Sequence, residues 1–506
     1  MATGSTVTGS RPEIRGLSYW MERVLKELDS VRKAPEPDAV HDLRVAIRRC
    51  RSVAGVMEEV DPDAAWPAMR KLGKKLFRQL GELRDTQVLE EWTEKLGPEA
   101  DSIRERLLTR FATAEKELQQ AAVKAVDKFD HKSWKKLERK LQRRSHLVVL
   151  DGLAAECLAL ERLEAAKELH VRALRAEKPE AWHALRVGVK RFRYTVESLL
   201  PARYEQWGED LKGLQDLLGE VHDLDVLSTK IAEVAGELDE QRAAWAERIA
   251  SQRHQRIEEY RRLTIGESGH WQHWRQGLPE GSRLITASQA RLRATARALE
   301  ADTRRAMLVS RLAARLFDAL AKLHTVPALA DKNVRKILRG AARLHGIGTG
   351  LDVKSPEKAA RKYLKAMVLP PGWTEPEWDI MVNVIRYQRG GLPDPQHKSF
   401  ARFRPEEQKL ISTLAGVLRL ARALGKSGVS SPTGLRAENS VEALIVRVPG
   451  LQESEENAAR LAAGKYLLEI NLGKPLIVKA AQLAPRLVEL PRKEELPAPS
   501  SAVASD

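Results

Sequence analysis

An internal repeat is the feature that most constrains this chain. Residues 41–51 and 183–193 have the same order of charged and apolar positions, and six residues are identical at equal spacing. A second matching pair, residues 80–89 and 218–227, follows in the same order. Two ordered matches indicate one structural unit used twice. We therefore predict a domain over residues 12–265, with copies at about 12–150 and 151–265 related by a pseudo-two-fold axis.

The periodicity of this region predicts helices. Residues 12–262 are rich in Leu, Ala, Glu, Arg and Lys, with apolar residues recurring at helical spacing. Glycine and proline are mostly confined to short breaks, for example at residues 35–37, 61–62 and 178–179. The pattern therefore predicts a mainly α fold, with two pseudo-symmetric helical bundles.

The rest of the chain differs in texture. Residues 264–283 contain four glycines and one proline and predict a linker or a long loop, so we assign 266–300 to a linker or helix. A second helical domain is expected at 301–430. Residues 431–490 predict a small α+β element, with strands at 443–448 and 466–470. The Pro/Ser/Ala-rich end, 491–506, is expected to be a disordered tail.

Each copy of the repeat places basic side chains on one helix face. On a helix, His41, Arg44, Arg48 and Arg51 lie at i, i+3, i+7 and i+10, which is a single stripe. The second copy repeats this stripe as His183, Arg186, Lys190 and Arg193. The apolar faces beside the two stripes are Leu43, Ala46, Ile47 and Cys50 in the first copy and Leu185, Val189 and Phe192 in the second.

These stripes suit a polyanion. Four basic side chains over roughly 15 Å of helix repel one another unless an anion lies between them. Arginine matches phosphate because its planar fork donates two parallel hydrogen bonds. For one stripe a solvated basic face is an equal alternative, but two copies in the same order favour polyanion contact. Asp42 is the only acid inside either segment, so we expect that local ion pairing does not neutralise the stripes.

Other basic residues leave alternatives open. Lys71, Lys75 and Arg78 share a helix face, and the second copy offers chiefly Lys212, which predicts a lopsided site. The strongly basic segment 131–144 could line the same site or be a solvated helix. The two stripe histidines could donate to phosphate or be satisfied interior residues.

Composition narrows the class of protein. Net charge is +16, from 86 Lys+Arg against 70 Asp+Glu, which predicts local basic surfaces on a mixed-charge helical protein. The two cysteines form neither a disulfide framework nor a metal motif. We see no signal peptide in residues 1–11 and no stretch of ~18 apolar residues that would span a membrane, so we expect a cytoplasmic protein.

Aromatic residues argue against nucleic acid as the ligand. They make up 5% of the chain, and only Trp182 adjoins a stripe. Single-strand binders usually stack bases on exposed aromatic rings. We expect other tryptophans, such as Trp20, Trp66 and Trp207, to be packing anchors between helices.

The repeated motifs resemble CHAD domains, the conserved histidine α-helical domains. The resemblance rests on the two stripe segments and on residues 80–85 with their second copy, where His222 replaces Arg84. It implies two four-helix-type bundles around a central basic channel, with polyphosphate as ligand and an association with polyphosphate granules. Carried over by position, the candidate contacts are the stripe residues together with Arg49, Arg191, Lys75, Arg78 and Lys212.

A second resemblance concerns the C-terminal half. Residues 341–348 look like an HD-type phosphohydrolase core, and 301–430 resembles the C-terminal helical domain of exopolyphosphatases and guanosine pentaphosphatases, with support from 385–393 and 418–424. An HD site needs His and Asp ligands for a metal that activates water. Here Gly346 stands in place of the Asp, Gln388 in place of a His, and Arg422 and Gly425 where acids are expected.

This degenerate pattern predicts no metal, no catalytic residue and no cofactor. The remaining surface is then a candidate for docking, homodimerisation or polyphosphate contact. His324, His345 and His397 lack ligand spacing and are expected to be structural. The sequence thus predicts a non-enzymatic polyphosphate-binding protein with no membrane contact. The alternatives are an enzyme or regulator of polyphosphate or nucleotide-phosphate hydrolysis acting through the C-terminal region and, less favoured, a nucleic-acid binder.

Overall fold

The computed structural model describes residues 16–33, 37–176, 178–234, 239–300, 302–324 and 327–481. The tail predicted at 491–506 lies outside them. The chain divides into two compact units. The first comprises residues up to Ala306 together with Gly340–Tyr387, and the second comprises Met307–Arg339 and the residues from Gln388 onward. No helix among the described residues is long and apolar enough to cross a membrane.

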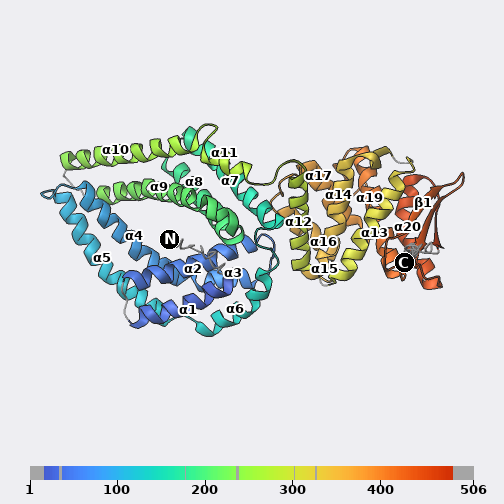
Figure 1. Cartoon of the computed structure of the whole chain (residues 1–506), viewed down its shortest axis with the longest axis horizontal. Coiled ribbons are helices and arrows are strands. Elements are labelled where there is room, and N and C mark those ends of the chain that lie inside the picture. The colour runs from blue at the N-terminus through green and yellow to red at the C-terminus, as the bar shows by residue number, and fades with distance from the viewer. Residues whose placement is uncertain are drawn as a thin grey trace, which may run out of the picture. The chain divides into compact units, whose positions relative to one another are not determined.

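The first unit contains both copies of the repeated motifs, in matching series of helices (Figure 1). The first series is α1 (Leu17–Lys33), α2 (Pro37–Met57), α3 (Ala65–Leu72), α4 (Lys74–Leu96), α5 (Ser102–Asp127) and α6 (His131–Ser145). The second is α7 (Leu153–Ala176), α8 (Pro179–Leu199), α9 (Pro201–Val234), α10 (Asp239–Thr264) and α11 (His270–Gln276). Helix α9 is continuous where the first series breaks at Gly73 between α3 and α4.

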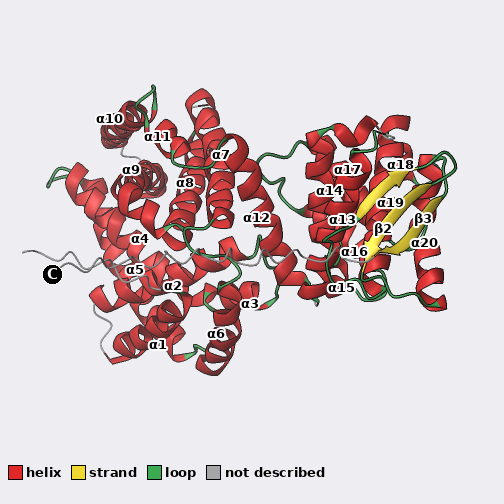
Figure 2. Cartoon of the chain, turned by 45° about the vertical axis from the view of Figure 1, so that its right-hand side comes forward, coloured by secondary structure: helices red, strands yellow, loops and turns green. Residues whose placement is uncertain are grey.

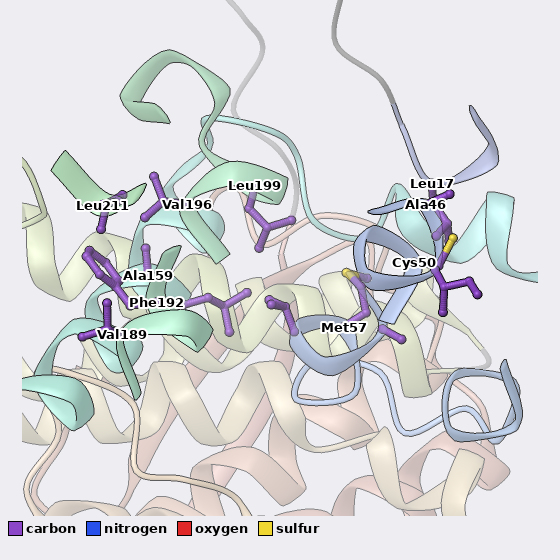
Figure 3. Packing of buried hydrophobic residues seen from close by; sticks show 14 of the residues in the cluster. Leu17, Ala46, Cys50, Met57, Ala159, Val189, Phe192, Val196, Leu199 and Leu211 are labelled. Carbon is purple, nitrogen blue, oxygen red and sulfur yellow. The ribbon is translucent and has the colours of Figure 1, made fainter. Parts of the chain in front are cut away.

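Equivalent helices pack in equivalent ways. Helix α1 packs on α2 as α7 packs on α8, and α4 packs on α5 as α9 packs on α10. The two series meet where α2 contacts α8 and α4 contacts α9. One hydrophobic cluster runs through both, as Figure 3 shows for Cys50 and Met57 from one copy and Phe192 and Leu199 from the other. The predicted mainly α fold with two pseudo-symmetric halves is confirmed.

The predicted apolar faces form this core. Leu43, Ile47, Leu185 and Phe192 are fully buried, because the amphipathic pattern turns them away from the basic stripes. The remaining members of those faces, Ala46, Cys50 and Val189, are also fully buried. Of the predicted tryptophan anchors, Trp66 and Trp207 are buried, and Trp20 is partly buried against the same core.

The glycine-containing stretch 264–283 is more ordered than a long loop. It contains α11, in which Trp271 and Trp274 are buried one turn apart, and the start of α12 (Gly281–Leu299). These two large apolar side chains, at i and i+3, pack against the core. Their packing stabilises a short helix that the neighbouring glycines would not favour. Helix α12 packs on α7 and on α15. The other helices of this part of the chain are α13 (Thr303–Ala321), α14 (Lys332–Leu344), α15 (Ile347–Leu351), α16 (Pro356–Ala366) and α17 (Glu375–Tyr387).

The second unit ends in a small three-stranded sheet (Figure 2). Its elements include η1 (Pro327–Ala330), α18 (Lys398–Ala401), α19 (Pro405–Lys426), β1 (Arg436–Asn439), β2 (Leu444–Pro449), α20 (Glu455–Leu472) and β3 (Leu476–Ala481). The strand order is β1-β2-β3, with β1 antiparallel and β3 parallel to β2.

The strand predicted at 443–448 is confirmed by β2, but the one predicted at 466–470 is wrong, because these residues lie in α20. A parallel β2–β3 pair needs a crossover, and α20 supplies it. The Ser454 side chain accepts the Asn457 N–H at the start of α20, and Gly473 ends the helix with a left-handed φ of 65°. The β-branched and aromatic content of 466–470 is overridden by packing of this helix on α19.

Candidate anion-binding site

The contact between α2 and α8 brings the two basic stripes together around a groove of about 560 Å³. Seven basic and two acidic side chains line it. Five of the seven were predicted from the sequence: Arg48, Arg51, Arg186, Lys190 and Arg191. The basic ladder of each repeat therefore contributes to one shared surface rather than to two separate ones.

Both acids of the groove already have a cation. Glu58 pairs with Arg70 at 2.6 Å, and Glu59 pairs with Arg162. Across the described parts of the chain, none of the five predicted groove cations has a carboxylate within ion-pair distance. The groove is thus strongly positive after its internal pairs are counted, and an added anion would relieve the repulsion between its side chains.

Burial and crowding perturb the cations around the groove. Burial first, and then the charges of Arg186, Arg48 and Arg44, lower the pKa of Lys190 to about 8. Burial lowers the pKa of Arg44 to about 10, and Asp85 opposes part of this shift. Burial is the first cause of both shifts, because these cations lie in a partly desolvated place, where a bound anion would be poorly screened.

Equivalent arginines make different bonds. Arg44 donates to the carbonyl oxygens of Leu80 and Gly81, the latter at 3.1 Å. Its counterpart Arg186 lies against Gly219, the counterpart of Gly81, but its Nε is buried and has no hydrogen-bond partner in the described structure. A buried donor without an acceptor is costly. Because Arg186 lines the groove, whereas Arg44 does not and is bonded to two carbonyl oxygens, Arg186 is the better placed of the two to donate to a ligand.

The expectation that local ion pairing leaves the stripes unneutralised is wrong at Arg193, and Arg49, a further predicted contact, is paired as well. The Glu197 carboxylate, buried one turn beyond the second stripe, pairs with Arg49 of α2 and lies 3.9 Å from Arg193 of α8. Arg193 also donates to the Tyr204 hydroxyl at 3.4 Å. Neither arginine lines the groove. Counting acids only inside the repeated segments missed Glu197, because it follows the motif on the same helix face.

The predicted lysines and the outlying arginine stay at the surface. Lys75, Arg78 and Lys212 are exposed and do not line the groove, and Arg78 lies 3.7 Å from Glu82. The sides of α4 and α9 that carry these three residues do not line the groove.

The stripe histidines are exposed rather than interior. His183 Nδ1 lies 3.3 Å from His222 Nδ1, and burial, with Arg186 and His183 nearby, lowers the pKa of His222 to about 4. His41 is exposed at the equivalent place, and its neighbour Asp42 accepts from Arg23 at 2.9 Å. Neither stripe histidine lines the groove.

The groove also contains residues that the sequence analysis missed. Arg70 comes from α3 and Arg162 from α7, neither of which carries the repeated motif. Arg51 lies over the Phe77 ring at 5.0 Å, and the Lys190 amine lies 6.0 Å from the centroid of Tyr194. Of these missed residues, Tyr194 could have been found from the sequence, because it directly follows the last residue of the second stripe.

A family model confirms the nature of this helical region. Residues 17–232 match the model described as the CHAD domain. The chain contains a CHAD domain.

Other comparisons add less. The crystal structure of the CHAD domain from the plant Ricinus communis is similar at 23% sequence identity and a TM-score of 0.34, covering 52% of this chain and 88% of that chain. No curated protein matches the chain significantly.

Downstream of the CHAD domain, residues 289–454 match the model described as Ppx/GppA phosphatase, domain III. The two family matches together indicate a role related to polyphosphate. The matched region begins within α12, the helix that packs on α7 of the CHAD domain.

This downstream region does not assemble the ligands of an HD metal site. His345 Nδ1 lies 2.8 Å from the Ala342 carbonyl oxygen, and a Cβ at Gly346 would overlap the carboxylate of Glu300. In the second unit, Arg422 donates to the Gln388 side chain. Across the described residues, no three His, Cys, Asp or Glu side chains lie together as a metal site would require. The residues present therefore do not fit a metal of this type.

Proposed function

We propose that the groove between α2 and α8 binds inorganic polyphosphate without hydrolysing it. The observation that carries the proposal is the set of five groove cations from two repeated helices, none with an acid partner in the described structure. A chain of closely spaced phosphates supplies one negative charge after another to such a ladder. Through this binding, the protein would associate with polyphosphate granules in the cytoplasm.

Aromatic residues in the groove favour polyphosphate over single-stranded nucleic acid. The ring of Phe77 is covered by the guanidinium of Arg51, and Tyr194 has Lys190 and Arg193 within 6.0 Å of its centroid. Bases stack on open aromatic faces in single-strand binders. Here those faces are taken by cations, so the groove recognises phosphate charge rather than bases.

The Ppx/GppA match favours a second candidate, regulation or catalysis of phosphate hydrolysis through the C-terminal region. Glu300 fills the space that a side chain at position 346 would need, which argues against catalysis through an HD-type metal. The C-terminal region is then a docking, dimerisation or polyphosphate-contacting surface.

A direct test titrates the full chain with long-chain polyphosphate, short oligophosphate and single-stranded DNA at two salt concentrations. The test variant is Arg48→Gln with Lys190→Gln, and the matched control is Arg78→Gln with Lys212→Gln, which removes the same charge outside the groove. We expect the test variant to lose about a hundredfold in polyphosphate affinity, at about 1.4 kcal/mol for each tenfold step.

Three results would count against the proposal. Equal affinity for DNA would make the groove a general nucleic-acid site. An equal loss in the control variant would show that only net charge matters. Phosphate release on adding a divalent metal would support the enzymatic candidate instead.

A further inference from the structure

Helix α6 carries a second cationic surface outside the groove. None of its residues lines the groove, so the first of the two alternatives for the segment 131–144 does not hold. The helix packs on α1 and α3 through Trp134 and Leu141, which are buried, and the Trp134 indole donates to the Met21 carbonyl oxygen at 3.0 Å. Both views place α6 beside α1 and α3 (Figures 1 and 2).

The side of α6 opposite Trp134 is a continuous basic stripe. Five exposed cations recur at i, i+3, i+4, i+7 and i+11 of the helix. At 3.6 residues per turn they fall within about 100° of its circumference and span about 17 Å. These residues are Lys132, Lys135, Lys136, Arg139 and Arg143.

The surroundings of the stripe do not neutralise it. At its edge, Lys140 pairs with Asp63 at 2.8 Å and Arg144 pairs with Asp61 at 2.5 Å. The five stripe cations have no carboxylate within ion-pair distance in the described chain. Two acids interact with them electrostatically, Glu138 with Lys135 and Arg139, and Asp130 with Lys132, which leaves the five cations in excess.

Helix α3, which contacts α6, also contributes to the groove together with α4. Gly73, at the junction of α3 and α4, packs against Trp134 of α6. On either side of that junction, Arg70 and Phe77 line the groove. Three exposed lysines flank the glycine: Lys71, Lys74 and Lys75. Exposed cations therefore lie on α3 and α4, the helices next to both the groove and α6, although Gly73 meets the buried side of α6 and not its stripe.

We propose that the α6 stripe is a second contact for polyphosphate, used by chains long enough to leave the groove. This inference rests on the proposed function of the groove. The stripe favours a flexible phosphate chain because lysine ammonium groups act as point charges that need no fixed ligand geometry. A chain held at both places gains from the higher effective concentration of its second segment.

The same surface fits a membrane or a nucleic acid less well. The apolar face of α6 is buried against α1 and α3, so the helix has no apolar side chains to insert into a bilayer. The exposed apolar residues nearby, Val149 and Leu150, lie beyond the end of the helix. The only aromatic side chain on α6, Trp134, is buried and offers no stacking face.

The test compares long-chain polyphosphate with a short oligophosphate, using the full chain. The variant is Lys132→Gln, Lys135→Gln, Lys136→Gln. The matched control removes three exposed lysines elsewhere: Lys116→Gln, Lys124→Gln and Lys358→Gln. We expect the α6 variant to lose about tenfold in affinity for long chains, with a salt dependence shallower by about two in log–log slope. Affinity for the short ligand, which the groove alone binds, stays unchanged.

An unchanged long-chain affinity in the α6 variant, or an equal loss in the control, would overturn this inference while leaving the groove intact. A larger loss of binding to anionic phosphatidylserine vesicles or to single-stranded DNA than to polyphosphate would assign α6 to those partners instead. If the wild-type chain binds neither oligophosphate nor polyphosphate, the proposed function itself fails. Circular dichroism of each variant checks that the helices remain folded.

Discussion

Helices α2 and α8 carry equivalent basic stripes, but the last residue of the stripe makes different contacts in the two helices. In α2, Arg51 lines the groove and donates to the Arg70 carbonyl oxygen at 2.9 Å. In α8, the equivalent Arg193 turns to Glu197 and Tyr204. One turn further along, α8 has Glu197 where α2 has Gly55. A single acid beside a repeated motif therefore decides which of its cations remain available to a ligand.

The surroundings of the first residue of each stripe differ as well. His183 lies against His222 of α9, whereas the matching position in α4 is Arg84, which pairs with Glu91 at 2.9 Å. The Arg84 guanidinium reaches an acid on its own helix, while the His222 imidazole contacts the His183 imidazole of α8. Equivalent positions in a repeat are thus candidates for a shared role. The acids and hydrogen-bond partners around each position decide whether the two residues can have that role.

The largest expected effect comes from removing the acid that distinguishes the two copies. Glu197→Gln leaves Arg49 and Arg193 without their carboxylate in a place where the glutamate side chain is only 3% exposed. Breaking such a buried pair is expected to lower the free energy of unfolding by about 3 kcal/mol. Chemical denaturation measures this change.

Glu58→Gln is the control for that variant, since Glu58 pairs with Arg70 at the more exposed rim of the groove. It should cost less than about 1 kcal/mol. Equal losses in the two variants would mean that Glu197 does not hold the α2–α8 contact together.

A second comparison tests the two last stripe residues, Arg51 and Arg193, directly. Arg51→Gln removes a groove cation and is expected to weaken polyphosphate binding about tenfold, or roughly 1.4 kcal/mol. Arg193→Gln should leave that affinity within about twofold while lowering stability, because its charge is committed to Glu197. Isothermal titration with parallel thermal unfolding distinguishes them. Equal losses of affinity in the two variants would contradict the proposed difference between Arg51 and Arg193.

Making the first copy resemble the second should also weaken binding. In Gly55→Glu the new side chain has room, because a Cβ at Gly55 meets nothing within 4 Å. Its carboxylate would compete with phosphate for the groove cations and lower affinity several-fold, about 1 kcal/mol. Gly55→Gln is the uncharged control and should bind like the wild type. A gain of about 0.5–1 kcal/mol in stability is expected in both variants, since glycine is unfavourable within a helix.

A pH dependence is expected from Lys190. Its folded pKa of about 8 is lowered below the ordinary lysine value, so the unfolded chain binds the proton more tightly between about pH 8 and 10. Stability without ligand should therefore rise with pH across that window. Polyphosphate affinity should fall over the same window, by at most about tenfold per pH unit for one proton.

Lys190→Gln should flatten this pH-dependent component of both curves. Unfolding and binding measured from pH 7 to 10 supply the comparison. Persistence of the full slope in the variant would assign the titration to another group, such as Arg44, whose pKa is lowered to about 10.

Parts of the fold and the site were predictable because they depend on patterns along one helix. The helical spacing that buries Leu43 and Phe192 also turns Arg48 and Lys190 away from the core, so stripe and core follow from one periodicity. The helix at 466–470 was not predictable from local preference, since only the parallel pairing of β2 and β3 requires a crossover there. Arg70 and Arg162 were missed because they reach the groove from helices that lack the motif.

What the sequence determined by itself is the repeat, its helical character and the identity of the cations that two equivalent helices can offer. These depend on residue order, spacing and helical period, which are local. What only the tertiary structure decided is which of those cations face the groove. That choice depends on the close approach of α2 to α8, on the position of Glu197 between Arg49 and Arg193, and on charges brought in by Arg70 and Arg162. Electrostatic interactions act through space, so their partners are chosen by packing rather than by position along the chain.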